Sequence, residues 1–82
     1  MKQLTIYSTS TCPYCHMEKE YLKSKNIDFV DKVVDTDTEA LAEMMQLSGQ
    51  LAVPFTVIKK EVGREEKILG FDKPRLDKIL GL

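Results

Sequence analysis

The stretch CPYCH, residues 12–16, contains both cysteines of the chain and its only histidine. Two thiols in a C-x-x-C spacing can bind a metal, attach a haem, form a structural disulfide or undergo reversible oxidation. The elements that position Cys12 and Cys15 decide which of these chemistries is available to them.

The residues around the two cysteines predict a strand that leads directly into a helix. In QLTIY (3–7), every second residue is apolar, so that Leu4 and Ile6 lie on one side, as is typical of a short strand. After Cys12, apolar and aromatic residues recur at intervals of three and four; these are Tyr14, Met17, Tyr21 and Leu22. The segment that follows, KSKN (23–26), has the basic residues and the Asn that are typical of the C-terminal end of a helix. Cys12 is therefore expected at the strand-to-helix junction, with Cys15 about one turn into the helix.

Three further strands are predicted, over residues 27–34, 53–60 and 67–70. Pro54 must lie at the beginning of the strand predicted over residues 53–60, because proline cannot donate a hydrogen bond inside a ladder. The segment EVGREE (61–66) is expected to turn the chain between the last two strands.

Two further helices are predicted. In DTDTEALAEMMQLSG, Thr36-x-x-Glu39 matches a capping box and Gly49 is expected to end the helix. Its apolar face would consist of Leu41, Met44 and Met45. Asp72 is expected to cap the last helix. That helix carries Leu76, Ile79 and Leu80, with Pro74 tolerated in its first turn.

The order βαβαββα predicts an α/β fold with a four-stranded mixed sheet flanked by three helices. The first β-α-β unit requires parallel pairing with a right-handed crossover. The last two strands are expected to pair as an antiparallel hairpin. The chain has 82 residues, so residues 1–82 are expected to form one domain.

Composition excludes several classes of function. The 12 basic and 13 acidic residues give a net charge of −1, and no basic cluster suggests nucleic-acid binding. No apolar run approaches the ~18 residues of a membrane span, and the N-terminus lacks the apolar region of a secretory signal. We therefore expect a cytoplasmic protein, where a C-x-x-C is catalytic or metal-binding rather than a permanent crosslink.

The predicted placement of the cysteines fits reversible disulfide chemistry. Residues three apart on a helix lie on one face with Cα atoms roughly 5 Å apart, within the range that a disulfide requires. The unpaired N–H groups and the dipole at the helix N-terminus would stabilise a thiolate at Cys12. Cys15 would be deeper and less ionised. Cys12 is thus expected to attack a substrate, and Cys15 to resolve the resulting mixed disulfide.

The alternatives fit the sequence less well. CPYCH matches the attachment motif of c-type haem, but such haem needs a second axial ligand and normally an exported chain. A closed structural zinc site needs four ligands, whereas the chain has two cysteines and one histidine. We therefore expect no bound metal. Two incidental cysteines would not need this strand-to-helix setting.

With CPYC before a helix and Val53-Pro54 at the mouth of a strand, the chain resembles a dithiol glutaredoxin of the thioredoxin superfamily. GQLAVPFTVI and GFDKPRLDKIL extend the resemblance over nearly the whole length. The resemblance implies a thioredoxin-like fold, a cis bond before Pro54, and glutathione as reductant and co-substrate without a permanently bound cofactor. The glutathione-binding and substrate-binding positions that it implies are Thr11, Pro13, Tyr14, Ala52, Val53, Pro54, Gly70, Phe71 and Asp72.

Within that resemblance, Val53 would pair its backbone with the cysteinyl part of glutathione, and Tyr14 would line the groove. Gly70, Phe71 and Asp72 would hold the γ-glutamyl carboxylate at a helix N-terminus. Asp72 can serve as an N-cap at the same time.

The chain also departs from the family pattern in ways that would weaken glutathione binding. Thr9 or Ser10 replaces a common Lys before the first cysteine, and Leu51 and Ala52 replace a basic residue and a Thr before Val-Pro. Phe71 replaces the second Gly of a Gly-Gly pair. Gln50 could compensate for part of this loss.

The sequence thus predicts a monomeric thiol–disulfide oxidoreductase that acts on disulfide-containing or glutathionylated client proteins. Two alternatives remain open. One is a glutaredoxin-like redoxin that is reduced by thioredoxin reductase and donates electrons to ribonucleotide reductase. The other is an iron–sulfur carrier in which Cys12 thiolates of two chains and two glutathione molecules hold the cluster.

Overall fold

The computed structural model describes residues 3–60 and 65–81 of the chain. The elements follow the order β1, α1, β2, α2, β3, β4, α3, as predicted. Their bounds are Gln3–Ser8 (β1), Pro13–Ser24 (α1), Val30–Val33 (β2), Thr38–Ser48 (α2), Phe55–Lys59 (β3), Glu65–Leu69 (β4) and Lys73–Leu80 (α3). Among the described residues, no helix combines the length and apolar character that a membrane span requires.

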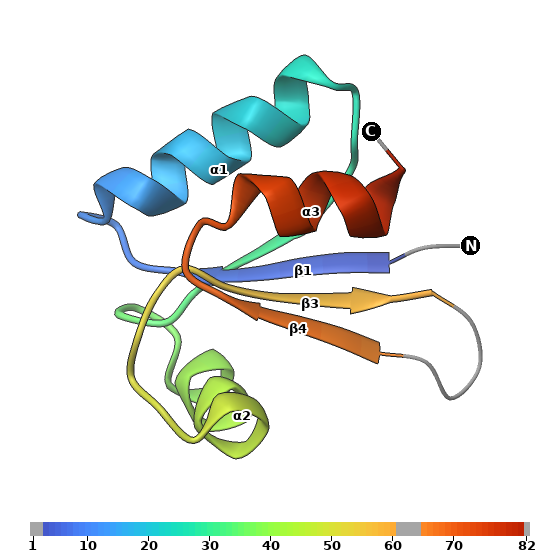
Figure 1. The fold of residues 1–82 in the computed structure, drawn as a ribbon. Helices are drawn as coiled ribbons and strands as arrows, with labels where there is room; N and C mark the ends of the chain where they lie inside the picture. The colour runs from blue at the N-terminus through green and yellow to red at the C-terminus, as the bar shows by residue number, and fades with distance from the viewer. Residues whose placement is uncertain (1–2, 61–64, 82) are drawn as a thin grey trace.

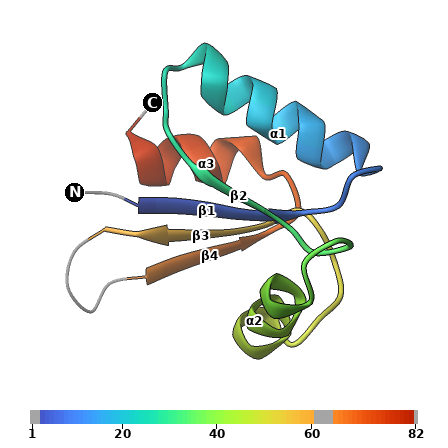
Figure 2. The same ribbon diagram turned by 180° about the vertical axis from the view of Figure 1, so that it is seen from behind.

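The four strands form one mixed sheet in the order β2-β1-β3-β4. β1 pairs with β2 in parallel, and β3 pairs antiparallel with both β1 and β4. Helices α1 and α3 lie on one face of this sheet and α2 lies on the other (Figure 1), which the reverse view shows equally well (Figure 2). The predicted α/β class, parallel first unit and antiparallel hairpin are confirmed.

Each face of the sheet has its own apolar core. The cluster beneath α1 and α3 consists of Leu4, Ile6, Leu22, Ile58, Ile68 and Leu76. The cluster beneath α2 consists of Tyr7, Val34, Ala40, Met44, Phe55 and Val57. Alternation along β3 sends Phe55 and Val57 to one face and Ile58 to the other. β3 is buried along most of its length because both of its faces are covered.

The strand boundaries differ from the predicted ones. β2 is shorter than the predicted 27–34, and β3 begins after Pro54 rather than at Val53. β4 begins at Glu65, so the last two residues of the predicted turn over 61–66 belong to a strand. The rest of that turn lies outside the described residues. Ladder hydrogen bonds, rather than apolar character alone, determine where a strand starts and stops.

The predicted capping box of α2 is wrong. The N-cap is Asp37, whose carboxylate accepts hydrogen bonds from the N–H groups of Glu39 and Ala40 at 3.1 and 3.2 Å. The Thr36 hydroxyl instead donates to the carbonyl oxygen of Val33. A carboxylate is a stronger acceptor than a hydroxyl for helix N–H groups. Gly49 ends the helix in the left-handed region, as expected.

The apolar faces of α1 and α2 are narrower than the sequence indicated. Met45 is 39% exposed whereas Met44 is buried. On α1, Tyr14 and Met17 point to solvent, being 63% and 53% exposed. The buried residues of α1 are instead Cys15, Glu18 and Leu22. Because these lie three and four residues apart, they form one stripe along the helix. The stripe includes the carboxylate of Glu18, so the spacing of apolar residues alone does not reveal it.

The cap of α2 can be tested by a pair of substitutions. Asp37→Ala should lower the free energy of unfolding by about 1 kcal/mol, since a carboxylate N-cap is lost. Thr36→Ala should cost less than about 0.5 kcal/mol, as for most surface changes. Urea unfolding of the oxidised protein measures both. If Thr36→Ala lowers the free energy of unfolding more than Asp37→Ala does, Thr36 is the N-cap and the predicted capping box is correct.

Candidate active site

Three chain segments meet at one end of the sheet. In the register, Tyr7 near the end of β1 faces Phe55 at the start of β3, and Phe55 faces Leu69 at the end of β4. The loops that continue from these positions carry Cys12, Pro54 and Gly70, and they lie at the same end of the molecule (Figure 1). A hydrogen bond from the Gly70 N–H to the Pro54 carbonyl oxygen, at 2.8 Å, joins two of these loops.

The two cysteines occupy the first turn of α1. Cys12 is the N-cap, with extended backbone angles, and Pro13 occupies the first helical position, where its missing N–H leaves no bond unmade. Cys12 and Cys15 form a disulfide with Cα atoms 5.2 Å apart. Cys12 keeps 9% of its surface exposed and Cys15 keeps 0%. The pair is therefore bonded and asymmetric, with Cys12 as the accessible member.

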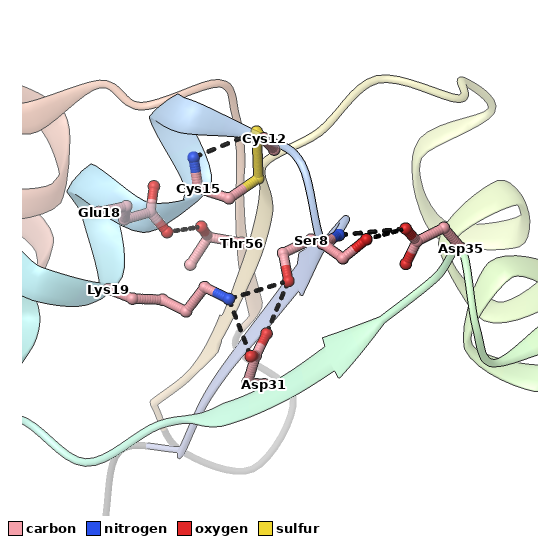
Figure 3. The surroundings of a disulfide bond; sticks show 9 residues. Ser8, Cys12, Cys15, Glu18, Lys19, Asp31, Asp35 and Thr56 are labelled. Carbon is pink, nitrogen blue, oxygen red and sulfur yellow. Dashed lines mark hydrogen bonds and ion pairs between the residues drawn. A yellow bond between two sulfur atoms is a disulfide. The ribbon is translucent and has the colours of Figure 1, made fainter.

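A backbone hydrogen bond is directed at the accessible sulfur. The N–H of Cys15 donates to Cys12 Sγ at 3.1 Å. The same N-terminal turn points its other unpaired amides toward the cap, and the helix dipole adds positive potential there. Figure 3 shows the hydrogen bond from the Cys15 backbone to Cys12. This environment favours negative charge on Cys12 over negative charge on the buried Cys15.

The carboxylate of Asp35, which follows β2, holds the loop before Cys12 in place. Asp35 accepts hydrogen bonds from the N–H and the hydroxyl of Ser10, at 3.1 and 2.6 Å. These bonds lower the pKa of the Asp35 carboxyl below its ordinary value. A negative charge thus lies beside the position where the predicted resemblance would place a lysine. The Ser10–Asp35 hydrogen bonds therefore join the loop before Cys12 to the segment after β2.

The predicted binding residues before and within α1 are exposed. Thr11, Pro13 and Tyr14, which flank Cys12 in sequence, are all exposed. In the loop before β3, Ala52 is exposed, Val53 is partly buried and Pro54 is buried. The bond between Val53 and Pro54 is cis, as the resemblance implied. Within the described residues, the N–H and C=O of Val53 make no backbone hydrogen bond, so this short stretch can pair with an extended ligand.

The predicted residues after β4 have structural roles that can be seen directly. Gly70 has a positive φ of 81°, which favours glycine. The Phe71 ring packs against Tyr21, with centroids 6.1 Å apart. Asp72 caps α3 by accepting a hydrogen bond from the Arg75 N–H at 3.3 Å. The cap role predicted for Asp72 is confirmed, and its role toward a ligand stays a prediction.

The sequence prediction missed a polar network behind the disulfide. Lys19 Nζ contacts Asp31 Oδ2 at 2.9 Å and Ser8 Oγ at 3.3 Å, and the Ser8 hydroxyl donates to Asp31 Oδ1 at 2.7 Å. It joins α1 to β1 and β2 (Figure 3). Ser8 is fully buried whereas Asp31 is exposed, so the network runs from the interior beneath α1 to the surface.

A second missed residue is Glu18, which is buried between α1 and β3. The Thr56 hydroxyl donates to Glu18 Oε2 at 2.5 Å. The signal in the sequence is the spacing: Glu18 lies three residues after Cys15 and four before Leu22, on the same stripe of the helix.

Metal ligands do not gather at this site. Among residues 3–60 and 65–81, no three His, Cys, Asp or Glu side chains lie close enough together to hold a metal ion. His16 follows Cys15 in sequence but is exposed on α1.

Comparison with known proteins gives a consistent result. A family model described as Glutaredoxin matches residues 4–62. A protein from Clostridium pasteurianum, described as an uncharacterized glutaredoxin-like 8.6 kDa protein in the rubredoxin operon, is 48% identical over 77 residues, or 94% of this chain and 96% of that protein. A glutaredoxin from Neisseria meningitidis is 46% identical over 55 residues, or 66% of this chain and 65% of that protein.

Solved structures of glutaredoxins and glutaredoxin-like proteins are also similar to this chain. The glutaredoxin-like protein NrdH-redoxin from Escherichia coli, whose activity profile is described as thioredoxin-like, superposes with a TM-score of 0.71 at 26% identity. The match covers 94% of this chain and 93% of that one. The predicted thioredoxin-like fold is therefore confirmed.

Proposed function

Because the chain belongs to the glutaredoxin family, we propose that it is a glutathione-dependent thiol–disulfide oxidoreductase that uses Cys12 and Cys15. The observation that carries this proposal is the hydrogen bond from the Cys15 N–H to Cys12 Sγ at the N-cap of α1. The proposed substrates are protein disulfides and glutathione mixed disulfides of client proteins. The proposed setting is a monomer in the cytoplasm.

The first step is attack by the Cys12 thiolate on one sulfur of the substrate disulfide. A new bond forms between Cys12 Sγ and that sulfur, and the other sulfur leaves as a thiolate. The N-cap position supports this step because the amides of the first turn stabilise the attacking anion. With a glutathionylated client, Cys12 takes up the glutathione and the client leaves as a thiolate. A second glutathione then attacks the sulfur of the bound glutathione, which forms glutathione disulfide and frees the Cys12 thiolate.

With a protein disulfide, the second step uses the other cysteine. Cys15 attacks Cys12 Sγ, the reduced client leaves, and the Cys12–Cys15 disulfide forms. The 5.2 Å between their Cα atoms supports closure without rearrangement of the helix. Two glutathione molecules then reduce the pair, so the electrons pass from glutathione to the client through sulfur alone.

Glutathione is proposed to bind beside Cys12, with its cysteinyl backbone along Val53 and its γ-glutamyl carboxylate at the start of α3. Two features support this placement. The Val53 backbone makes no hydrogen bond within the described residues, and the bond between Gly70 and Pro54 keeps the two binding segments together.

A second candidate function is that of a redoxin reduced by thioredoxin reductase. The Ser10–Asp35 interaction favours it, since it puts a carboxylate on the loop that precedes Cys12, where negative charge opposes binding of the glutathione carboxylates. Leu51, 70% exposed, likewise offers no charge to them. The structural similarity to the NrdH-redoxin of E. coli supports the same alternative.

The roles of the two cysteines can be separated by mutation. Cys12→Ser should abolish all activity, because the other thiol, Cys15, is buried and cannot reach a substrate disulfide. Cys15→Ser should retain deglutathionylation and lose reduction of protein disulfides, since only the latter needs a resolving thiol. Assays with a glutathionylated peptide and with a disulfide-bonded protein distinguish the two reactions. Equal loss of both in Cys15→Ser would contradict the assigned roles.

The reductant can be identified by a coupled assay that follows NADPH oxidation. We expect turnover with glutathione and glutathione reductase, and Leu51→Lys should lower the KM for glutathione about two- to fivefold, as for an exposed ion pair. Leu51→Gln, which adds polarity without charge, is the matched control. Turnover with thioredoxin reductase alone, with no effect of Leu51→Lys, would favour the redoxin.

A further inference from the structure

The buried carboxyl group of Glu18 has no role in the reaction described above. Glu18 is 1% exposed and lies one helical turn after Cys15 on the stripe of α1 that faces the sheet. Figure 3 shows its carboxyl group reaching toward Thr56 of β3, on the inner side of the disulfide. A carboxyl group is expensive to bury unless its oxygens are hydrogen-bonded.

Only one of the two Glu18 oxygens is satisfied. Oε2 accepts the Thr56 hydroxyl at 2.5 Å, whereas Oε1 is buried without a hydrogen-bond partner among the described residues. Burial raises the pKa of the Glu18 carboxyl, and the Thr56 hydrogen bond opposes that rise. An unsatisfied buried oxygen of this kind needs an explanation.

The charged groups on neighbouring elements do not supply the missing partner. Lys19 is engaged by Asp31 of β2 and Ser8 of β1. Further along α1, Tyr21 donates to Asp77 of α3, and Lys73 pairs with the same carboxylate. The remaining candidates for a partner of Glu18 Oε1 are the two cysteines of α1 itself. In the disulfide, neither sulfur carries a proton to donate.

We infer that Glu18 is the proton acceptor for Cys15, and that the Cys15 thiol of the reduced protein is the missing partner of Glu18 Oε1. This inference rests on the proposed dithiol reaction. Side chains three residues apart on a helix have Cβ atoms roughly 5–6 Å apart. The longer Glu18 side chain can span that distance to a thiol at Cys15.

The step is balanced as follows. In the mixed disulfide, Cys15 is a neutral thiol. As Cys15 Sγ bonds to Cys12 Sγ, its proton passes to the Glu18 carboxylate, and the bond from Cys12 to the substrate breaks with departure of the substrate thiolate. When a thiol reductant later opens the Cys12–Cys15 disulfide, the departing Cys15 thiolate takes the proton back from Glu18.

The resolving step can be isolated with Ellman's reagent. Cys12 attacks the reagent and releases one coloured thionitrobenzoate, and Cys15 then releases the second. At neutral pH, Glu18→Gln should slow the second release tenfold or more, because general-base catalysis typically contributes 10²–10⁴-fold. The first release should change less than about twofold. The defect should disappear at high pH, where hydroxide removes the proton.

Two further variants separate a proton acceptor from a structural contact. Glu20→Gln removes the same charge from the exposed face of α1 and should leave both releases unchanged. Glu18→Met replaces the buried carboxyl with an apolar side chain of similar length, a change that often preserves stability. It should reproduce the pH profile of Glu18→Gln. Normal second release in Glu18→Met or Glu18→Gln at neutral pH would overturn the inference.

A titration that needs no turnover tests the contact itself. In the Cys12→Ser background, the ultraviolet absorbance of the thiolate reports Cys15 alone. Adding Glu18→Gln should lower the pKa of Cys15, since a nearby negative charge is removed. An unchanged pKa would overturn the inference. If both tests succeed but no client disulfide is reduced, the proposed function fails and the proton transfer stands.

Discussion

The hydrogen bond from the backbone of Cys15 to the sulfur of Cys12 is the interaction on which the site depends. It exists because Cys12 is the N-cap of α1 and Pro13 starts the helix without an N–H of its own. The first turn thus directs its free amides at one sulfur and withdraws the other into the core. A pair of chemically identical side chains becomes an attacking group and a buried group through their place on one helix.

The sheet explains why the remaining segments gather at this helix start. β1 ends there, β3 begins there, and β4 ends there, because β3 is antiparallel to both neighbours. Gly70 then bonds to Pro54, which keeps the two binding loops together beside α1. The polar groups behind the disulfide complete the support, with Lys19 joining three elements and Thr56 holding Glu18. The same architecture that leaves a small part of Cys12 exposed therefore buries Cys15 and Glu18 on one stripe of α1.

Local patterns were enough to predict the order of elements, the cysteines at the start of a helix and the mixed sheet. Alternation and helical spacing are local properties, so Leu4, Ile6 and Leu22 fall on the core as expected. The cap at Asp37 and the inward face of Glu18 were not predicted. The first depends on which of two nearby acceptors reaches the helix amides. The second is indicated by the spacing of Glu18 from Cys15 and Leu22. Its hydrogen-bond partner Thr56, however, is far away in sequence, and β3 brings it opposite α1. Long-range pairs of this kind, Ser10 with Asp35 included, cannot be read from spacing.

Selective alkylation of the reduced protein tests the central claim most directly. Iodoacetamide modifies thiolates, so its rate against pH, resolved by peptide mass spectrometry, gives the ionisation of each cysteine separately. Cys12 should react first, with a midpoint well below the ~8.5 of a free thiol, and Cys15 should lag at every pH. If Cys12 reacts no faster than free cysteine at neutral pH, the amides of α1 do not activate it and the account is contradicted.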